Sequence, residues 1–356
     1  MRLLDLRDCS TGRERGLRHG QTFAGEIRSL CDIRIYLACK ISGFEREGLL
    51  AAADEHLPVL EQFDNELYDE LVGIAEGAGV PASYLVVLNH YTDLRDLTPP
   101  SASEGEADFD GGCTMLWSRG DKGAVFAQTW DMHASATPYV MMLRVSDADG
   151  GDAWILSLTG CLGMAGLNAT GMAIGINNLT STDAKVGVVW SALIRQALRQ
   201  TSVAVARDVI LGAPLGSGHH YLVCDASEVY SIETSGTHRK VIFDGGKDSF
   251  VHSNHCLDGE VGACSRVPPK STSYDRHEAM LALMAKAPVR SAEDAWEYLG
   301  SHEGYPRSIC TNMATPELPH AAATCAGIAI ELAERKVLAV GGFTHAVAPG
   351  LYTFDE

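Results

Sequence analysis

The sequence predicts an α+β fold in which two sheets are covered by helices on their outer faces. Three observations lead to this prediction. Apolar residues recur every three or four positions up to about residue 97, and after a linker-like segment the apolar period drops to two. Beyond residue 190, helical and strand patterns alternate again. This order of elements is typical of two packed sheets with helices outside.

The first part of the chain, residues 12–97, is predicted to be helical. One run of apolar side chains shows the spacing of a single helix face: Leu57, Leu60, Phe63, Leu67, Leu71 and Ile74. A further helix is predicted to open at Pro81 and to run through Asn89 and His90. Residues 98–112 then form an acidic linker of small residues with two prolines, in which we expect no regular structure.

The strands predicted after the linker form an antiparallel meander. They cover residues 113–118, 124–129, 140–145, 154–158, 163–167 and 172–176. Asn168-Ala-Thr-Gly171 has residue types that tolerate positive φ, so we expect a hairpin turn there. The remaining predictions are helices at 190–200, 202–211, 273–285 and 291–299, and strands at 221–224, 229–233, 240–243, 326–332 and 336–340.

Composition excludes several classes of partner. The chain has 356 residues, 46% of them hydrophobic, and a formal charge of -18 from 46 acidic and 28 basic residues. This charge argues against nucleic acid and against anionic membrane surfaces. The N-terminus lacks the apolar stretch of a signal peptide, and no CxxC pair occurs, so we expect a cytoplasmic protein without a zinc ribbon or other cofactor.

Cys113 is the most informative residue. It follows two glycines and an acidic linker, and it stands at the start of a predicted strand. A self-cleaving nucleophile needs this placement, because its thiolate attacks the preceding carbonyl and Gly112 has no Cβ to obstruct the attack. The freed α-amine, with an ordinary pKa of about 7.7–8.0, then accepts the thiol proton. The alternative is a glycine turn that leads into a strand with an ordinary cysteine.

Several motifs in register carry a resemblance to a known family. They are Gly112-Cys113-Thr114, Ala-Gln-Thr-Trp-Asp at 127–131, Ala-Gly-Leu-Asn-Ala-Thr-Gly-Met-Ala at 165–173, Val-His-Ser-Asn-His-Cys at 251–256, Asp-Arg-His at 275–277 with Met280, and Tyr-Pro-Arg-Ser-Ile-Cys at 305–310. Together they resemble the acyl-coenzyme A:6-aminopenicillanate acyltransferases and related amide hydrolases. The match runs from the Arg18-His19-Gly20 region to near the C-terminus.

The resemblance implies an N-terminal-nucleophile fold, a four-layer αββα sandwich with two mostly antiparallel sheets. It also implies a precursor that cleaves itself between Gly112 and Cys113, so that residues 1–112 and 113–356 become two associated chains of one domain. Cys113 takes the nucleophile position. Asp131 takes the position that holds or tunes the new α-amine, and Asn254 takes that of an oxyanion donor.

Further site residues follow from the resemblance with less detail. A backbone N–H near Asn177 and Asn178 takes the place of a second oxyanion donor, although two adjacent asparagines also suit a turn. We therefore expect Asn178 to be catalytic. The residues expected to bind substrate are Thr114, Trp130, His133, Asn177 and Ser308.

Two other interpretations concern the histidines around Asn254. A metal site could use His252, His255 and Cys256 with His219 and His220, but adjacent histidines on a strand point to opposite faces, so we expect no metal. A papain-like pair could instead join Cys113 to His252 or His255, with Asn254 as the orienting residue. The linker and the motifs favour the α-amine as the base.

The chain also departs from the family pattern at two positions. Met115 stands where the family's acyltransferase has a threonine, and Thr311 replaces an arginine. Loss of that arginine suggests a pocket less suited to a carboxylate-bearing substrate such as a penicillin nucleus.

We therefore expect a cysteine amide hydrolase acting on a small-molecule amide or thioester. The alternatives are an acyltransferase that passes the acyl group to an amine and, from another class, a non-catalytic binding module. A homo-oligomer is possible.

Overall fold

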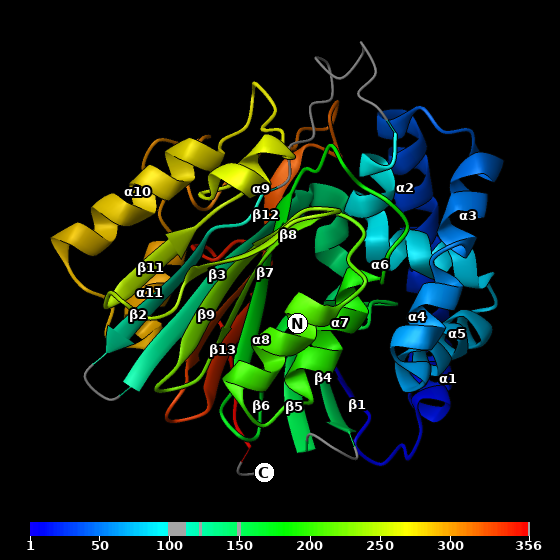
Figure 1. Cartoon of the computed structure of the whole chain (residues 1–356), viewed down its shortest axis with the longest axis horizontal. Helices are drawn as coiled ribbons and strands as arrows, with labels where there is room; N and C mark the ends of the chain where they lie inside the picture. The colour runs from blue at the N-terminus through cyan, green and yellow to red at the C-terminus, as the bar shows by residue number, and fades with distance from the viewer. Residues whose placement is uncertain (99–111, 121–122, 148–150, 355–356) are drawn as a thin grey trace.

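The fold was determined from a computed structural model of the chain. The structure describes residues 1–98, 112–120, 123–147 and 151–354 (Figure 1). Almost all of the predicted linker, residues 99–111, lies outside these ranges.

The strands form two sheets. The larger sheet has eight strands in the order β1-β4-β5-β6-β7-β8-β9-β10, and the smaller has six in the order β11-β2-β3-β12-β13-β14. The strands of the larger sheet are β1 (Arg2–Asp5), β4 (Val140–Asp147), β5 (Gly151–Leu158), β6 (Ala165–Asn168), β7 (Ala173–Leu179), β8 (Gly218–Cys224), β9 (Val229–Thr234) and β10 (Arg239–Phe243). Those of the smaller sheet are β2 (Met115–Gly120), β3 (Gly123–His133), β11 (Ser249–His252), β12 (Ala322–Glu331), β13 (Lys336–Gly341) and β14 (Gly350–Tyr352). Only β1 with β4 pairs in parallel within these sheets, which confirms the predicted antiparallel character.

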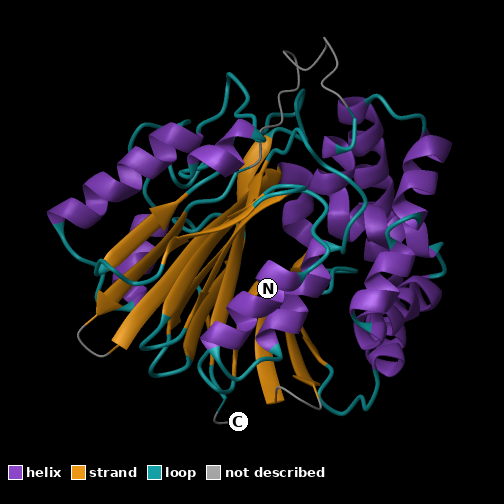
Figure 2. Cartoon of the chain, in the orientation of Figure 1, coloured by secondary structure: helices purple, strands orange, loops and turns teal. Residues whose placement is uncertain are grey.

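Helices cover the outer face of each sheet (Figure 2). The helices of the described residues are α1 (Gly12–Thr22), α2 (Ala24–Ser42), α3 (Arg46–Asp54), α4 (Leu57–Phe63), α5 (Asn65–Ala78), α6 (Ala82–Asp96), α7 (Trp190–Leu198), α8 (Val203–Gly212), α9 (Gly259–Ala263), α10 (Ser273–Lys286) and α11 (Ala292–Leu299), with a short 3-10 helix at Ala134–Tyr139. Helices α10 and α11 pack against the smaller sheet, and α7 and α8 pack against the larger one. The result is the predicted αββα sandwich.

The two sheets face each other across a largely apolar core. Gln128 of β3 connects them, because its side-chain amide donates to the Ile176 carbonyl and accepts from the Ile176 N–H, both at 3.1 Å. Trp117 of β2 also packs edge-on against Phe243 of β10. A buried amide with both of its functions satisfied fixes the position of β3 relative to β7.

Glycines bring α1 and α5 into close contact. Gly12, Gly16 and Gly20 recur every fourth residue and therefore share one face of α1. A Cβ at Gly16 would lie 2.1 Å from the carbonyl oxygen of Glu70, so no other residue fits there. This approach places α1 and α5 as one unit beside the larger sheet (Figure 1).

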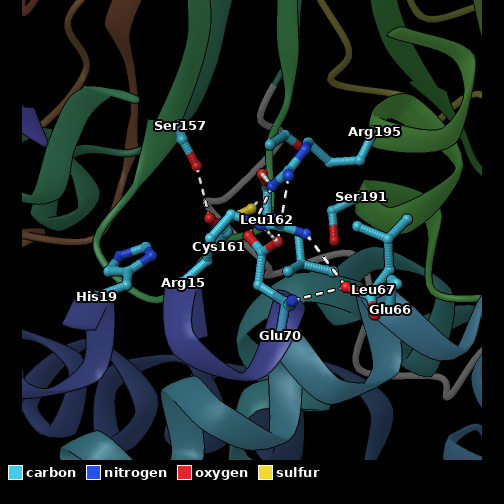
Figure 3. A network of polar contacts seen from close by, with 12 residues as sticks. Arg15, His19, Glu66, Leu67, Glu70, Ser157, Cys161, Leu162, Ser191 and Arg195 are labelled. Carbon is cyan, nitrogen blue, oxygen red and sulfur yellow. Dashed lines mark hydrogen bonds and ion pairs between the residues drawn. The ribbon is translucent and has the colours of Figure 1, made fainter. Parts of the chain in front are cut away.

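A buried charge network joins these helices to α7 (Figure 3). Glu70 of α5 accepts two hydrogen bonds from Arg195 of α7, at 2.7 and 3.1 Å, and one from Arg15 of α1 at 2.9 Å. These three side chains are at most 3% exposed. Charge-assisted, bidentate bonds in a buried setting fix both geometry and register. The network thus connects the N-terminal helices to the segment that follows Cys113.

Some elements were not predicted. Strands β1, β11 and β14 are short or lie at sheet edges, where the apolar pattern is weak. The predicted strand from residue 113 begins only at Met115, and the helix predicted through His90 continues to Asp96 with a kink at His90. The hairpin turn is confirmed: Gly171 has φ 93° and the Asn168 side chain accepts from the N–H groups of Thr170 and Met172.

No single helix among the described residues is both long and apolar enough to cross a membrane. Helices α5 and α6 meet that criterion only when joined across a bend of 118°.

Candidate active site

Cys113 lies just before β2, buried between the two sheets. Its neighbour Thr114 is held to β3, since the Thr114 carbonyl accepts from the Thr129 N–H at 2.9 Å and the Thr114 N–H donates to the Thr129 hydroxyl at 3.1 Å. Residue 113 is therefore fixed by backbone contacts on its C-terminal side.

Both ends of the peptide bond between Gly112 and Cys113 are held by hydrogen bonds. The Gly112 carbonyl accepts from the backbone N–H of Asp131 at 2.6 Å. The Cys113 N–H donates to Oδ1 of Asn254 at 2.7 Å. A donor on the carbonyl oxygen polarises the bond that a neighbouring thiol would attack, and the acceptor on nitrogen fixes its orientation.

Arg276, on the first turns of α10, supports this peptide from the other side. One of its terminal nitrogens donates to the Cys113 carbonyl at 2.7 Å and to the Thr114 hydroxyl at 2.9 Å. The other donates to Oδ1 of Asn254 at 2.9 Å. The planar guanidinium thus orients the nucleophile backbone and the candidate oxyanion residue together.

The surroundings of position 112 require a glycine for a steric reason that the sequence alone did not indicate. A Cβ there would lie 2.2 Å from a terminal nitrogen of Arg276 and 3.0 Å from Oδ1 of Asn254. Both neighbours are fixed by their own hydrogen bonds, so a larger residue would displace the contacts that support the Gly112–Cys113 peptide.

The titratable groups at the site are strongly affected by burial. Burial raises the pKa of the Cys113 thiol to about 12, and the Asp131 carboxylate contributes to the rise. Arg276 and hydrogen bonds from the Asp131 backbone and the Asn177 side chain act in the opposite direction. Burial also raises the pKa of Asp131 to about 6, against the lowering effect of Arg276. The thiol is therefore protonated at neutral pH and needs a base.

One oxygen of Asp131 has no partner in the part of the chain that the structure describes. Its Oδ1 is buried without a hydrogen bond, whereas Thr324 and Thr129 lower the pKa of Asp131 through side-chain hydrogen bonds. An unpaired buried carboxylate oxygen beside Cys113 is an acceptor for a proton or an ammonium group.

The two asparagines of β7 contact the site in different ways. Asn178 accepts from Nδ2 of Asn254 through its backbone carbonyl, at 2.9 Å. The expected oxyanion contact of a backbone N–H near Asn177 and Asn178 stays a prediction. The side chain of Asn177 instead interacts with the Cys113 thiol, and its Oδ1 lies 2.9 Å from His220 and 3.1 Å from His252.

The histidines near Asn254 are engaged elsewhere. The ring nitrogens of His252 lie next to Asn177 and Glu233, the latter at 2.9 Å. His255 pairs with the Ser273 hydroxyl, and burial lowers the pKa of His255 to about 4. Neither geometry supports a papain-like pair with Cys113. His220 stacks on His252 at 3.6 Å whereas His219 faces Asp93, so the two adjacent histidines do point apart.

A small cavity, partly open to solvent, lies beside Cys113. Its walls come from both sheets and from the N-terminal helices. The lining residues are Thr92, Arg95, Gly112, Cys113, Trp130, Asp131, Met132, Ile176, Asn178, Trp190, His219 and Asn254. The structure thus brings together most of the predicted site: the cleavage pair, Asp131, Asn178, Asn254 and Trp130.

Four residues expected to bind substrate do not line this cavity. Thr114 and Asn177 lie behind Cys113. The Thr114 hydroxyl contacts Arg276, and the Asn177 side chain contacts His220. His133, at the end of β3, lies 2.8 Å from the Ser135 hydroxyl because the chain turns into the 3-10 helix there. Ser308 donates to the Cys310 carbonyl at 2.6 Å, so it stabilises its own loop.

The sequence assigned no role to two arginines near the site. Arg276 contacts the Cys113 carbonyl and Asn254 from behind the cavity, and a buried arginine on a helix is itself a signal. Arg95 lines the cavity and bonds to Asp96 and the Thr180 hydroxyl. Arg95 therefore places a cation at the cavity wall, which no local sequence pattern indicated.

Comparisons with known proteins point in one direction. A model of the family described as acyl-coenzyme A:6-aminopenicillanic acid acyl-transferase matches residues 118–339. The acyl-coenzyme A:6-aminopenicillanic-acid-acyltransferase 40 kDa form of Emericella nidulans is 26% identical over 309 residues, which cover 84% of this chain and 82% of the relative.

Two solved structures are more distantly similar. Penicillin V acylase from Agrobacterium tumefaciens has a TM-score of 0.40 at 12% identity, covering 67% of this chain and 84% of that one. A mutant of the conjugated bile acid hydrolase from Clostridium perfringens has a TM-score of 0.45 at 9% identity, covering 68% and 97%.

Proposed function

Since the chain belongs to the acyl-coenzyme A:6-aminopenicillanic acid acyl-transferase family, as its motifs suggested, we propose that it is a self-cleaving cysteine enzyme that hydrolyses a small N-acyl amide through a thioester on Cys113. Family membership makes the chain an enzyme of the acyltransferase and N-terminal-nucleophile hydrolase class. The self-cleavage, the residue roles and the substrate are the further content of the proposal.

The observation that carries the proposal is the restraint of the Gly112–Cys113 peptide at both ends, by Asp131 N–H and by Asn254. In the first step the Cys113 sulfur attacks the Gly112 carbonyl carbon, the thiol proton passes to the Cys113 nitrogen, and the C–N bond breaks. The product is a thioester with a free α-amine. Water then attacks the thioester, the C–S bond breaks, and Gly112 leaves as a carboxylate while the thiol regains its proton.

Asp131 supports this sequence of steps through its unpaired oxygen. With a pKa raised to about 6, its carboxylate is mostly ionised at neutral pH and interacts electrostatically with the Cys113 thiol. It can accept the thiol proton before cleavage and hold the new ammonium group afterwards.

In the mature enzyme the α-amine of Cys113 acts as the base toward its own thiol. Cys113 attacks the acyl carbon of the substrate, and Asn254 stabilises the oxyanion through the amide hydrogen that Asn178 does not use. The amine leaves, and water hydrolyses the thioester. An amide is suited to this position because it is a neutral donor that keeps its protons.

The two chains are expected to stay together after cleavage. Strand β1 of the first chain pairs with β4 of the second over Arg2–Asp5, and Arg195 binds Glu70 across the same division. These contacts are independent of the peptide that is cut, so they support a stable association.

The cavity supports a substrate with a small apolar acyl group. Trp130, Met132, Ile176 and Trp190 supply apolar surface around the nucleophile. The second candidate is acyl transfer to an amine, which the name of the Emericella nidulans relative favours. Hydrolysis and transfer share the thioester and differ only in the group that resolves it.

Denaturing electrophoresis and intact mass spectrometry test the proposal. The wild type should give fragments of residues 1–112 and 113–356, and Cys113→Ala should remain whole. A panel of N-acyl amides, with and without hydroxylamine and with an enzyme-free control, separates hydrolysis from transfer, because enzyme-dependent hydroxamate requires an acyl-enzyme that amines can reach. A wild type that stays intact and inactive would remove the basis of the proposal.

A further inference from the structure

A second group of reactive side chains lies away from the Cys113 cavity. His302 and Cys310 belong to the segment between α11 and β12, and His345 follows β13. One ligand atom from each residue lies within 4.8 Å of the others. Cys310 Sγ is 3.4 Å from Nδ1 of His345, and the rings of His302 and His345 meet edge-on at 3.9 Å.

The backbone around these residues is fixed. The Cys310 N–H donates to the Ser301 carbonyl at 3.0 Å, which places the thiol beside His302. The Thr344 hydroxyl donates to the Leu299 carbonyl at 2.6 Å, which holds the residue before His345 against the end of α11. The three side chains therefore converge because the fold holds two separate loops together.

We propose that His302, Cys310 and His345 bind one thiophilic divalent transition-metal ion, of which Zn²⁺ is the natural example. A tetrahedral zinc site with Zn–S of about 2.3 Å and Zn–N of about 2.0–2.1 Å places its ligand atoms roughly 3.3–3.6 Å apart. The Cys310–His345 separation already lies in this range, and small rotations of the exposed His302 and His345 side chains complete it. The fourth position is open to water.

Binding releases one proton. Cys310 must bind as the thiolate and the histidines as neutral imidazoles, so the thiol proton passes to solvent when the metal–sulfur bond forms. No electron transfer is involved. The bound ion cross-links the loop after α11 to the loop after β13.

A second histidine–cysteine group provides a matched comparison. Asp183, His238 and Cys264 also lie within 4.8 Å of one another. There, however, the Asp183 carboxylate already accepts hydrogen bonds from Ser181, Ser235, Gly236 and Thr237. Because these hydrogen bonds already occupy the Asp183 oxygens, we expect Asp183, His238 and Cys264 not to bind a metal ion.

The site is proposed apart from the Cys113 chemistry, and it departs from the expectation of no metal drawn from the sequence. His302, Cys310 and His345 are separated by 8 and 35 positions along the chain, too irregular for a zinc motif. Only the tertiary contact between the two loops reveals the group.

Titration of chelator-treated protein with Co²⁺ tests the inference by absorption spectroscopy. We expect one equivalent to bind, with a sulfur-to-cobalt charge-transfer band, visible bands of a tetrahedral ion and release of one proton. Zn²⁺ should displace the cobalt. His345→Ala and Cys310→Ser should each weaken binding at least about 100-fold, because loss of an outer-shell partner alone weakens metal sites by about 10- to 100-fold.

Cys264→Ala and Cys113→Ala are the controls and should keep the full spectrum and stoichiometry. His302→Ala and His345→Ala change exposed side chains, so they decide the question if the buried Cys310 variant does not fold. The inference is overturned by a wild type without the charge-transfer band, by a His345→Ala protein that binds as well as the wild type, or by loss of binding in Cys264→Ala.

Discussion

Arg276 fixes the side-chain amide of Asn254. A terminal nitrogen of Arg276 donates to Oδ1 of Asn254 at 2.9 Å, and the Cys113 N–H donates to the same oxygen at 2.7 Å. With its oxygen held by two donors, the amide directs its NH2 group toward the Asn178 carbonyl. One amide hydrogen remains for an oxyanion. We therefore propose that Arg276 is a positioning residue, which acts through Asn254 and the Cys113 backbone.

Arg276→Lys should slow self-cleavage and turnover. A lysine carries a single ammonium group and cannot contact Asn254, Thr114 and the Cys113 carbonyl with one planar fork. Loss of one charge-assisted hydrogen bond of about 1.5–3 kcal/mol corresponds to roughly a 10- to 100-fold lower rate. The reduction should appear in kcat more than in KM when measured on matured protein.

Arg307→Lys is the matched control on the neighbouring loop. Arg307 is exposed and pairs with Asp275 at 2.8 Å, so its replacement should leave both rates near the wild-type values. Equal effects of the two substitutions would assign Arg276 a general structural role instead.

Gly112→Ala should block or strongly slow cleavage even though the nucleophile is intact. The new methyl group would lie 2.2 Å from Arg276 and must displace either the guanidinium or the scissile peptide. Time-resolved electrophoresis measures the effect. Gly25→Ala is the control, since its Cβ meets no atom within 4 Å, and it should mature normally. Normal processing of Gly112→Ala would contradict the packing described here.

The layers of the fold could be predicted from the sequence because they depend on local patterns, and the position of Cys113 before a strand could be predicted for the same reason. Strand alternation on either side of Asn168-Ala-Thr-Gly171 and the position of Cys113 after Gly112 are readable along the chain. The short edge strand β1 was missed because it pairs with β4, a partner more than 100 residues away, and carries little apolar pattern of its own.

The site was predictable only in part. Motif positions gave Asp131 and Asn254, which line the cavity, but His133 and Ser308 were assigned to the substrate although local turns direct them elsewhere. Arg95 and Trp190 reach the cavity from elements on opposite sides of the linker. Their convergence depends on helix packing, which no single stretch of sequence encodes.

Asp131→Asn should stabilise the uncleaved chain in a pH-dependent way. The folded pKa of about 6 exceeds the ordinary 3.8, so the folded state binds more protons between these values and the free energy of unfolding falls as pH rises through this window. Above pH 6 the ionised carboxylate lowers stability by roughly 3 kcal/mol, which asparagine avoids.

Urea denaturation in a Cys113→Ala background at pH 4 and pH 7.5 measures this effect without cleavage. The gain from Asp131→Asn should be small at pH 4 and near its full size at pH 7.5. A gain that is the same at both values would mean that the carboxyl has an ordinary pKa. In the self-cleaving background, Asp131→Asn should also abolish maturation.

Glu70→Gln should destabilise the fold by about 3–5 kcal/mol, because it removes the buried carboxylate that Arg15 and Arg195 share (Figure 3). Glu76→Gln, on the same helix but 53% exposed and paired with Arg13, should change stability by less than about 1 kcal/mol. Chemical denaturation compares the two. Similar values for both variants would show that the buried network contributes no more than a surface pair.

The identity of the base can be tested by adding one residue before Cys113 of the mature chain. The free α-amine should be the base toward the Cys113 thiol, and an extra residue converts it into an amide without a basic lone pair. Residues 113–356 produced together with 1–112 should be active without processing once the initiator methionine is removed, whereas the extended chain should be inactive.

The histidine variants test the rival base. His252→Ala and His255→Ala should retain substantial activity if they fold, since the imidazole rings of His252 and His255 contact Asn177, Glu233 and Ser273 instead of the thiol.

One residue added after Glu356 is the matched control for the extension and should have no effect on turnover. Intact mass spectrometry must confirm that the residue before Cys113 is still present, because self-cleavage could remove it. Full activity of a verified extended chain would exclude the α-amine. Loss of turnover in a folded His252→Ala protein would instead indicate that His252 is the base. The buried Glu233 would then orient its imidazole as the third member of a triad.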